Sequence, residues 1–302
     1  MDGLLIMDKP VGLTSHDVVA RVRRILKTKR VGHTGTLDPF ATGVMVILVG
    51  QATRLAQFLD KDEKEYEALM RFGFETDTGD HTGVRSAESR MGNEELAEIL
   101  ATASWDQILS SFRGQIEQVP PMYSAKKVEG KKLYELARKG VEIERKPILV
   151  TIRKLEIVIG GEIRIPYSAL RIRVICSAGT YIRTLAEDIG RAVGVGAYLA
   201  ELRRMRAGRF DISRAVTLAD FEAIADPVSA LIPMCEAVVH LPEIVLTEER
   251  ATKTKNGLSS RFPDAGFADG DTVRMVNADA DLVAIGVYRA DEKTVQPKVV
   301  LG

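Results

Sequence analysis

The sequence predicts an α+β protein in two parts, a large part that mixes strands with helices and a small C-terminal β-barrel. The chain has 302 residues, about twice the length of a typical single domain. Before residue 215, segments with strand periodicity occur alongside segments with helix periodicity. From Leu241 onward, short strand-like runs separated by turn residues replace them.

The chain begins with a strand, a helix and a second strand. Gly3–Met7 is a short apolar run that predicts a buried strand, ended by the lysine-proline turn that follows it. Thr14 and Asp17 have the spacing of a capping box, and apolar residues recur behind them at helical intervals. A glycine-rich loop, residues 32–43, then leads into the apolar strand Val44–Val49.

Three more elements are expected before residue 180. Apolar residues alternate along Tyr66–Phe74, which is typical of a strand with one buried face. Glu94–Ala103 is expected to form a helix and Arg171–Cys176 a strand. A further helix is expected next, with an inner face made of Ile182, Leu185, Ala186 and Ile189. Gly194 or Gly196 is expected to end it.

The C-terminal part is rich in turn signals. They are Lys255-Asn256-Gly257, Asp269-Gly270-Asp271 and Asn277-Ala278-Asp279. Their spacing predicts a small β-barrel. We place the linker within Pro233–His240, so the expected domains are residues 1–237 and 240–302.

Composition excludes several classes of protein. The longest apolar run has six residues, whereas a membrane helix needs about 20. Asp2 stands where a secretory leader is basic. Cys176 and Cys235 are too few for a disulfide framework, and the four histidines have no metal-site spacing. We therefore expect a soluble cytoplasmic protein without a metal.

Charged residues are unevenly distributed along the chain. The whole chain has a formal net charge of 0, but residues 1–214 carry +6 and residues 215–302 carry −6. Basic residues of the first part gather in three clusters, within residues 21–30, 126–146 and 203–209. Such clusters are typical of a surface that binds a polyanion along its backbone, and equally of solvated helix faces. Both interpretations stay open for any single cluster.

The loop Gly32–Gly43 is the most informative stretch. Its glycines, hydroxyls and single carboxylate suggest a phosphate-binding loop, but it has neither the P-loop nor the dinucleotide-binding pattern. Asp38 lies at the entrance to a core strand. From the residues alone, Asp38 is either a turn or helix-cap residue or a catalytic carboxylate.

The chain resembles the bacterial tRNA pseudouridine synthase B family. Six segments in the family's order carry the resemblance: Asp8-Lys9-Pro10-x-Gly12-x-Thr14-Ser15, Gly32-His33-Thr34-Gly35-Thr36-Leu37-Asp38-Pro39-x-Ala41-Thr42-Gly43, Thr76-Asp77-Thr78-x-Asp80, Pro120-Pro121-Met122-Tyr123-Ser124-Ala125, Gly179-Thr180-Tyr181-Ile182-Arg183-Thr184-Leu185 and Leu202-Arg203-Arg204. The similarity extends over nearly the whole chain. It implies a pseudouridine synthase fold, with a mixed and mainly antiparallel sheet flanked by helices and loops, and a C-terminal PUA-like barrel.

The resemblance also implies a reaction, the isomerisation of uridine 55 to pseudouridine in the T-arm loop of tRNA. The N1–C1′ bond breaks, uracil rotates and a C5–C1′ bond forms. No cofactor is expected, because the reaction has no redox step and no group donor. Asp38 matches the family's nucleophile, which must be ionised whether it attacks C1′, attacks C6 or removes the C2′ proton. Desolvation raises the pKa of a carboxyl group, so a cation is expected beside it, and Arg183 matches the family's arginine.

The same resemblance assigns the remaining site residues. Tyr66 matches the tyrosine that stacks on uracil, and Asp77 is expected to orient Arg183, with a simple turn as the alternative. Tyr181 and Leu202 are expected in the pocket, with core packing as the alternative. The other substrate-binding assignments are Lys9 and His33, the latter matching the residue that fills the gap left by the flipped base.

Binding of RNA is expected to come from a basic insertion. Residues 113–146 match the family's thumb, with Lys126, Lys127, Lys131 and Lys132 contacting phosphates. The expected partner is the tRNA T-arm stem-loop, bound by a monomer without a membrane or an obligate protein partner. The C-terminal domain departs from a strongly basic RNA binder, so we expect it to assist binding only weakly.

Two other classes stay open. One is a guide-RNA-dependent pseudouridine synthase that works inside a ribonucleoprotein, against which the short C-terminal domain and the basic thumb argue. The other is an RNA chaperone that folds tRNA by capturing the T-arm. Catalysis is favoured over a pure chaperone by the presence of Asp38, Tyr66 and Arg183 together.

Overall fold

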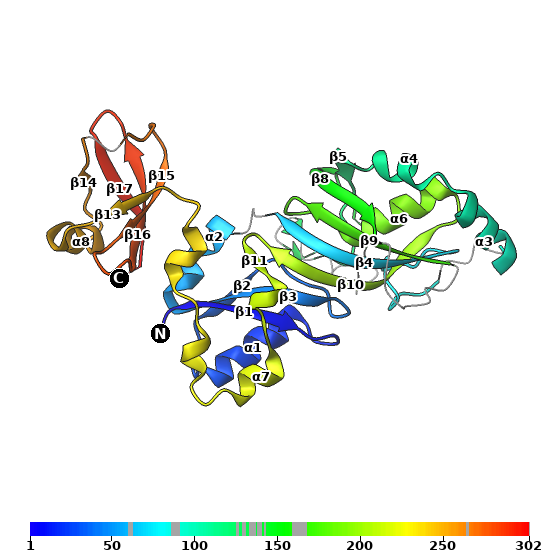
Figure 1. The fold of residues 1–302 in the computed structure, drawn as a ribbon, viewed down its shortest axis with the longest axis horizontal. Helices are drawn as coiled ribbons and strands as arrows, with labels where there is room; N and C mark the ends of the chain where they lie inside the picture. Colours follow the sequence, from blue (N-terminus) through cyan, green and yellow to red (C-terminus); the bar gives the residue numbers. More distant parts are fainter. Residues whose placement is uncertain are drawn as a thin grey trace.

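The computed structural model describes residues 1–59, 63–85, 91–124, 127–128, 131–132, 137, 141, 143–158, 168–263 and 266–301. Two sheets dominate the described chain (Figure 1). The large sheet has the strand order β12-β1-β3-β10-β4-β9-β8-β5, with β2 paired to β3 and β11 paired to β10. Among the described strands of this sheet, only the β1–β12 and β3–β10 pairs are parallel. The prediction of a mixed, mainly antiparallel sheet is confirmed.

The strands of the large sheet are β1 (Gly3–Lys9), β2 (Val31–Thr34), β3 (Thr42–Val49), β4 (Lys64–Phe72), β5 (Gly114–Gln118), β8 (Ile148–Ile157), β9 (Ala169–Cys176), β10 (Ala197–Ala207), β11 (Phe210–Asp211) and β12 (Val216–Thr217). The helices around it are α1 (Ser15–Ile25), α2 (Ala56–Leu59), α3 (Asn93–Thr102), α4 (Trp105–Ser110), α6 (Ile182–Val193) and α7 (Leu218–Ala223), with 3-10 turns η1 (Gly50–Leu55), η2 (Ile212–Arg214) and η3 (Pro227–Ala230). A separate two-stranded pair joins β6 (Lys127–Val128) to β7 (Lys131–Lys132).

Helices cover the two halves of the large sheet separately (Figure 1). Helices α1 and α7 pack on strands β1 and β3, where Val18, Val22 and Phe221 are fully buried. Helices α3, α4 and α6 pack on the other half, formed by β4, β8 and β9. Strands β10 and β4 join the halves and carry Tyr66, Leu202 and other residues that line part of the site described below.

Local sequence signals account for the ends of these helices. The Thr14 hydroxyl accepts a hydrogen bond from Asp17 N, and the Asp17 carboxylate accepts one from Thr14 N, so the capping box is confirmed. Helix α6 ends at Gly194, whose φ of 88° is left-handed and therefore favours glycine. The inner face predicted for this helix, residues 182, 185, 186 and 189, is buried.

The C-terminal part is a curled five-stranded sheet, and its order is β13-β15-β16-β17-β14 (Figure 1). Its elements are β13 (Glu243–Val245), α8 (Glu248–Lys255), β14 (Ser260–Arg261), β15 (Thr272–Val276), β16 (Leu282–Arg289) and β17 (Thr294–Val300). Antiparallel pairs dominate it, and β13 joins β15 in parallel.

The two sheets share a hydrophobic core. Ile285 and Leu301 of the C-terminal part belong to the same buried cluster as Leu4 and Ile6 of strand β1. The expected linker includes the 3-10 turn η4 (Met234–Val238), which buries Ala237 and Val238 in that cluster. Strand β1 is therefore buried on both faces, which explains its uninterrupted apolar run.

Strands β3 and β10 approach each other closely at Gly43. Gly43 has φ 100° and pairs with Arg204, and a Cβ atom there would overlap the Arg204 backbone. Only glycine fits both the conformation and the space. This contact brings the end of the glycine-rich loop against strand β10.

We expect Gly43→Ala to lower the free energy of unfolding by about 3–5 kcal/mol, because backbone strain and displacement of β10 add up. Gly114→Ala is the matched control. Gly114 also has positive φ, 88°, but a Cβ there meets nothing within 4 Å, so its expected cost is about 1–2 kcal/mol. Urea unfolding measures both changes, and equal costs would contradict the close approach.

Candidate active site

A cavity of about 490 Å³ opens at the junction of strands β4 and β10. The β2–β3 loop and the start of helix α6 complete its wall. Six residues predicted from the sequence line it: His33, Asp38, Tyr66, Tyr181, Arg183 and Leu202. They come from separate segments of the chain, so folding alone brings them together.

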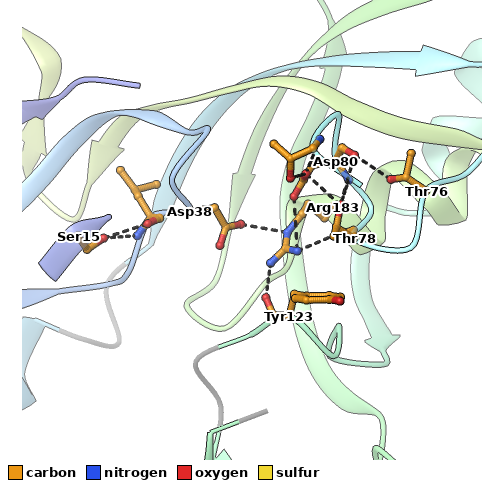
Figure 2. A network of polar contacts seen from close by, with 9 residues as sticks. Ser15, Asp38, Thr76, Thr78, Asp80, Tyr123 and Arg183 are labelled. Atoms are coloured by element: carbon orange, nitrogen blue, oxygen red, sulfur yellow. Dashed lines mark hydrogen bonds and ion pairs between the residues drawn. The ribbon is translucent and has the colours of Figure 1, made fainter. Parts of the chain in front are cut away.

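Arg183 lies between two carboxylates (Figure 2). Its Nε is 3.0 Å from Asp38 Oδ2, and its Nη1 is 3.7 Å from Asp80 Oδ2. Nη1 also donates to the Thr78 carbonyl at 2.8 Å, and Nη2 donates to the Tyr123 carbonyl at 2.7 Å. The Arg183 side chain is only 6% exposed. The guanidinium therefore joins the glycine-rich loop, the turn after β4 and the segment after β5.

Asp80, and not Asp77, is the second acid beside Arg183. Asp77 Oδ1 instead accepts a hydrogen bond from Val84 N, seven residues further on, at 2.7 Å, so the contact with Arg183 that was predicted for Asp77 is made by Asp80. Asp80 is held by the Thr78 hydroxyl and by Thr82 N. The Thr-Asp-Thr-x-Asp motif pointed to this turn, but spacing alone does not show which aspartate faces inward.

The Asp38 carboxyl group combines partial burial, with 33% of its side chain exposed, with a neighbouring cation. Burial raises the pKa of Asp38 above the ordinary value of 3.8, and the charge of Arg183 is the largest opposing effect. Asp80 raises this pKa further and Lys9 lowers it. The predicted cation beside Asp38 is present in this geometry, and the Arg183 charge opposes the effect of burial by favouring the ionised carboxylate.

Lys9 is a positioning residue of the Asp38 loop. Its side chain is buried, and Nζ donates to the carbonyls of Pro10, Pro39 and Ala41 at 2.8, 3.3 and 2.7 Å. Burial lowers the pKa of Lys9 to about 8. The predicted contact between Lys9 and substrate is therefore corrected to a structural contact with the loop.

Ser15 holds the same loop from helix α1. Its hydroxyl accepts a hydrogen bond from Leu37 N at 2.9 Å and donates one to Leu37 O at 3.0 Å (Figure 2). Ser15 is not among the site residues predicted from the sequence. The first motif contains it, but only tertiary contact shows that it supports the residue before Asp38.

The remaining lining residues differ in burial and polarity. Tyr66 and Leu202 are 8% and 7% exposed, and both belong to the core cluster as well as to the cavity wall. His33 Nδ1 is buried and has no hydrogen-bond partner in the described part of the chain, and burial lowers the pKa of His33 to about 4. His33 is therefore neutral at pH 7. Burial raises the pKa of the Tyr181 hydroxyl.

The lysines of the expected thumb are only partly described. Lys126 lies outside the described residues. Lys127 is in β6, and Lys131 and Lys132 are in β7, so the backbone forms an antiparallel pair at these positions. Within the described ranges, no helix is long and apolar enough to cross a membrane. No group of three or more potential metal ligands occurs among the described residues.

Two family models match consecutive parts of the chain. The TruB family pseudouridylate synthase (N terminal domain) matches residues 23–182. The tRNA pseudouridylate synthase B C-terminal domain matches residues 183–238.

Curated relatives and solved structures agree with these matches. The tRNA pseudouridine synthase B of Solibacter usitatus is 42% identical over 95% of each chain, and that of Heliobacterium mobile is 41% identical over 100% of this chain and 95% of its own. A structure of an H/ACA RNP bound to a substrate RNA containing 2′-deoxyuridine matches with TM-score 0.70 and 27% identity, over 99% of this chain and 85% of that chain. A Cbf5-Nop10-Gar1 complex matches with TM-score 0.70 and 28% identity, over the same shares. Family models, relatives along the whole length and a shared fold lead to one conclusion: the chain belongs to the TruB family, the tRNA pseudouridine synthases B.

Proposed function

We propose that this enzyme isomerises uridine 55 in the T-arm loop of tRNA, with Asp38 as the nucleophile. The observation that carries the proposal is the Asp38–Arg183 pair, 3.0 Å apart in the wall of a cavity large enough for a flipped nucleoside. Arg183 favours the ionised form of Asp38, which is the form that reacts. We further propose that the enzyme acts as a monomer on free tRNA in the cytoplasm.

The proposed chemistry gives a role to five side chains of the cavity. Tyr66 stacks on the flipped uracil, and base–aromatic stacking offsets about 1–3 kcal/mol of the cost of flipping. Tyr181 and Leu202 enclose the base, and neutral His33 fills the gap in the RNA loop. When the C1′–N1 bond breaks, the bonding electrons leave with uracil, and Asp38 stabilises or captures the electron-poor C1′. Rotated uracil then joins C1′ through C5, C5 loses its proton and N1 gains one.

Relatives of equal length favour action on free tRNA. An enzyme named tRNA pseudouridine synthase B is 42% identical and matches along 95% of both chains, whereas the proteins of the ribonucleoprotein structures are 27–28% identical.

A tritium-release assay tests the proposal. The purified chain is incubated with an unmodified tRNA transcript that carries tritium at C5 of the target uridine, and release of tritium indicates isomerisation. A chain that needs guide RNA releases no tritium when it is incubated with tRNA alone, and a pure chaperone folds tRNA without releasing tritium.

The C-terminal sheet is proposed to be a PUA-like domain that assists binding of the tRNA.

Asp38→Asn is expected to abolish tritium release and to leave tRNA affinity within about threefold, because phosphate contacts dominate binding. Asp77→Asn is the matched control. It retains an oxygen that can accept from Val84 N, so its single-turnover rate should stay within about threefold of wild type. Tritium release by Asp38→Asn, once deamidation is excluded by mass spectrometry, argues against Asp38 as the nucleophile.

The single-turnover rate should fall as the pH drops through the raised pKa of Asp38, so the acid limb lies above 3.8. Arg183→Gln removes the charge that favours the ionised carboxylate of Asp38, so the acid limb of the pH–rate profile should move to higher pH. Arg183→Lys is a separate test. It should lose most activity, because an ammonium cannot make the several contacts of a planar guanidinium. Burial raises the pKa of Glu187, one helical turn from Arg183, to about 7, so Glu187→Gln is the control that separates its titration. An unmoved acid limb in Arg183→Gln contradicts the pairing.

Replacing Lys126, Lys127, Lys131 and Lys132 by alanine should raise KM. The slope of log affinity against log salt should flatten by about 0.7–0.9 for each phosphate that the variant no longer neutralises. The single-turnover rate at saturating RNA should change little, since the phosphates are bound before the chemical step. Lys154→Ala is the charge control, because Lys154 pairs with Glu156 on strand β8. An unchanged salt slope removes the thumb from the RNA-binding surface.

A further inference from the structure

Arg204 is a buried cation in the cavity wall to which the proposed mechanism assigns no role in binding or catalysis. Its residue surface is 1% exposed, yet it is among the residues that line the cavity. Its Nε donates to the Val44 carbonyl at 2.6 Å, and its Nη2 donates to the Gly35 carbonyl at 3.0 Å. Both partners are neutral carbonyl groups, so they do not balance the positive charge of the Arg204 guanidinium.

Four other arginines of the same sheet have a carboxylate within 4.0 Å. Arg171 pairs with Glu201, Arg173 with Glu67, Arg203 with Asp8 and Arg206 with Glu63. Among the described residues, none places a carboxylate oxygen that close to Arg204, which is the most buried of the five. An unpaired buried charge is destabilising. Lys9 is also buried, but its three hydrogen bonds hold the Asp38 loop, whereas Arg204 lines the cavity, where a ligand can supply the opposite charge.

Arg204 faces the base-stacking tyrosine. The two residues are direct partners in the antiparallel register of β10 with β4. Burial raises the pKa of the Tyr66 hydroxyl, and the charge of Arg204 is the largest opposing effect, with a hydrogen bond from Arg204 acting in the same direction. The guanidinium therefore lies at the part of the cavity where Tyr66 would stack on uracil.

Charge is unevenly distributed around the cavity. Asp38 and Asp80 both contact the guanidinium of Arg183. Arg204 lines the same cavity and has no carboxylate oxygen within 4.0 Å among the described residues. Neutral His33 contributes no charge. Negative charge that develops on a ligand beside Arg204 is therefore stabilised there, whereas positive charge is favoured near Asp38.

This polarity matches the separation of charge in the proposed reaction, on which the inference rests. Breaking the C1′–N1 bond sends both electrons to uracil, whose N1, O2 and O4 atoms share the negative charge, and leaves C1′ electron-poor beside Asp38. We propose that Arg204 stabilises the negative charge that develops on uracil as this bond breaks. The charge disappears again when C5 bonds to C1′, the C5 proton leaves and N1 is protonated, so no further reactant is needed.

The test uses the full chain and a T-arm stem-loop that carries uridine or 5-fluorouridine at the target position. Fluorine withdraws electrons and stabilises a uracil anion by itself, so it partly replaces an anion-stabilising group of the protein. The measurement is the single-turnover rate at which the N1-linked nucleoside disappears at saturating RNA, after quenching and nuclease digestion. Variants are Arg204→Gln, Arg204→Lys and the control Arg171→Gln, all checked by thermal melting.

We expect Arg204→Gln to slow uridine turnover by about 100-fold or more, as removal of an oxyanion-stabilising donor does, and 5-fluorouridine turnover by only about tenfold. Arg171→Gln should leave both rates within about threefold, because Arg171 pairs with Glu201 and is not among the described lining residues. If Arg204→Gln does not fold, Arg204→Lys is tested in its place. The criterion is the same: its single-turnover rate should decrease more on uridine than on 5-fluorouridine.

Equal decreases in the single-turnover rates of the Arg204 variants on uridine and on 5-fluorouridine would overturn the inference, because they indicate a purely structural role for Arg204. Weaker RNA binding with unchanged saturated rates would also overturn it and would point to a phosphate contact instead. A wild-type chain that leaves uridine unchanged would refute the proposed function itself. An active wild type with equal decreases in the variants would refute only the role of Arg204.

Discussion

The contact between one buried guanidinium and two carboxylates underlies the arrangement of the site. Arg183 binds Asp38 and Asp80 together with the carbonyls of Thr78 and Tyr123. A planar guanidinium with five donors reaches all four partners, which a lysine ammonium does not. Without this cation, two carboxylates in a desolvated cavity would repel each other and favour protonation. The same contact therefore sets both the shape of the cavity and the charge of Asp38.

Support for the Asp38 loop comes from a different part of the chain. The loop has little regular structure, so its backbone groups need partners when they are buried. Lys9 donates hydrogen bonds to two carbonyls that follow Asp38 in the sequence, those of Pro39 and Ala41. Ser15 forms hydrogen bonds with both the N–H and the carbonyl of Leu37, the residue before Asp38. The motif around Lys9 and the motif around Asp38 therefore form one structural unit. This explains why a lysine is buried there with its charge facing carbonyls rather than substrate.

Strand β1 connects this unit to the C-terminal sheet. Alternate side chains of the strand pack in opposite directions, Leu5 and Met7 toward helix α1, and Leu4 and Ile6 toward the core shared with the C-terminal sheet. The acidic C-terminal part is thus attached through apolar contacts.

The sequence by itself determined the local structure and the main catalytic candidates. Periodicity and capping residues predicted β1, α1, β3, β4, α3, β9 and α6, because they depend on neighbours within a few positions along the chain. The ordered motifs indicated Asp38 and Arg183, and the cavity contains both. The C-terminal sheet was likewise expected from its turn residues, which act over two to four positions.

Only the tertiary structure decided which polar side chains meet. The partners of Arg183 at Tyr123 and Thr78 are 60 and 105 positions away in the chain, and those of Arg204 at Val44 and Gly35 are 160 and 169 away. Periodicity carries no information at these separations. The choice of Asp80 over Asp77, the burial of Lys9 and the unpaired charge of Arg204 all depend on such contacts. Burial then decides their chemistry, because the energy of a charge depends on whether water or protein surrounds it.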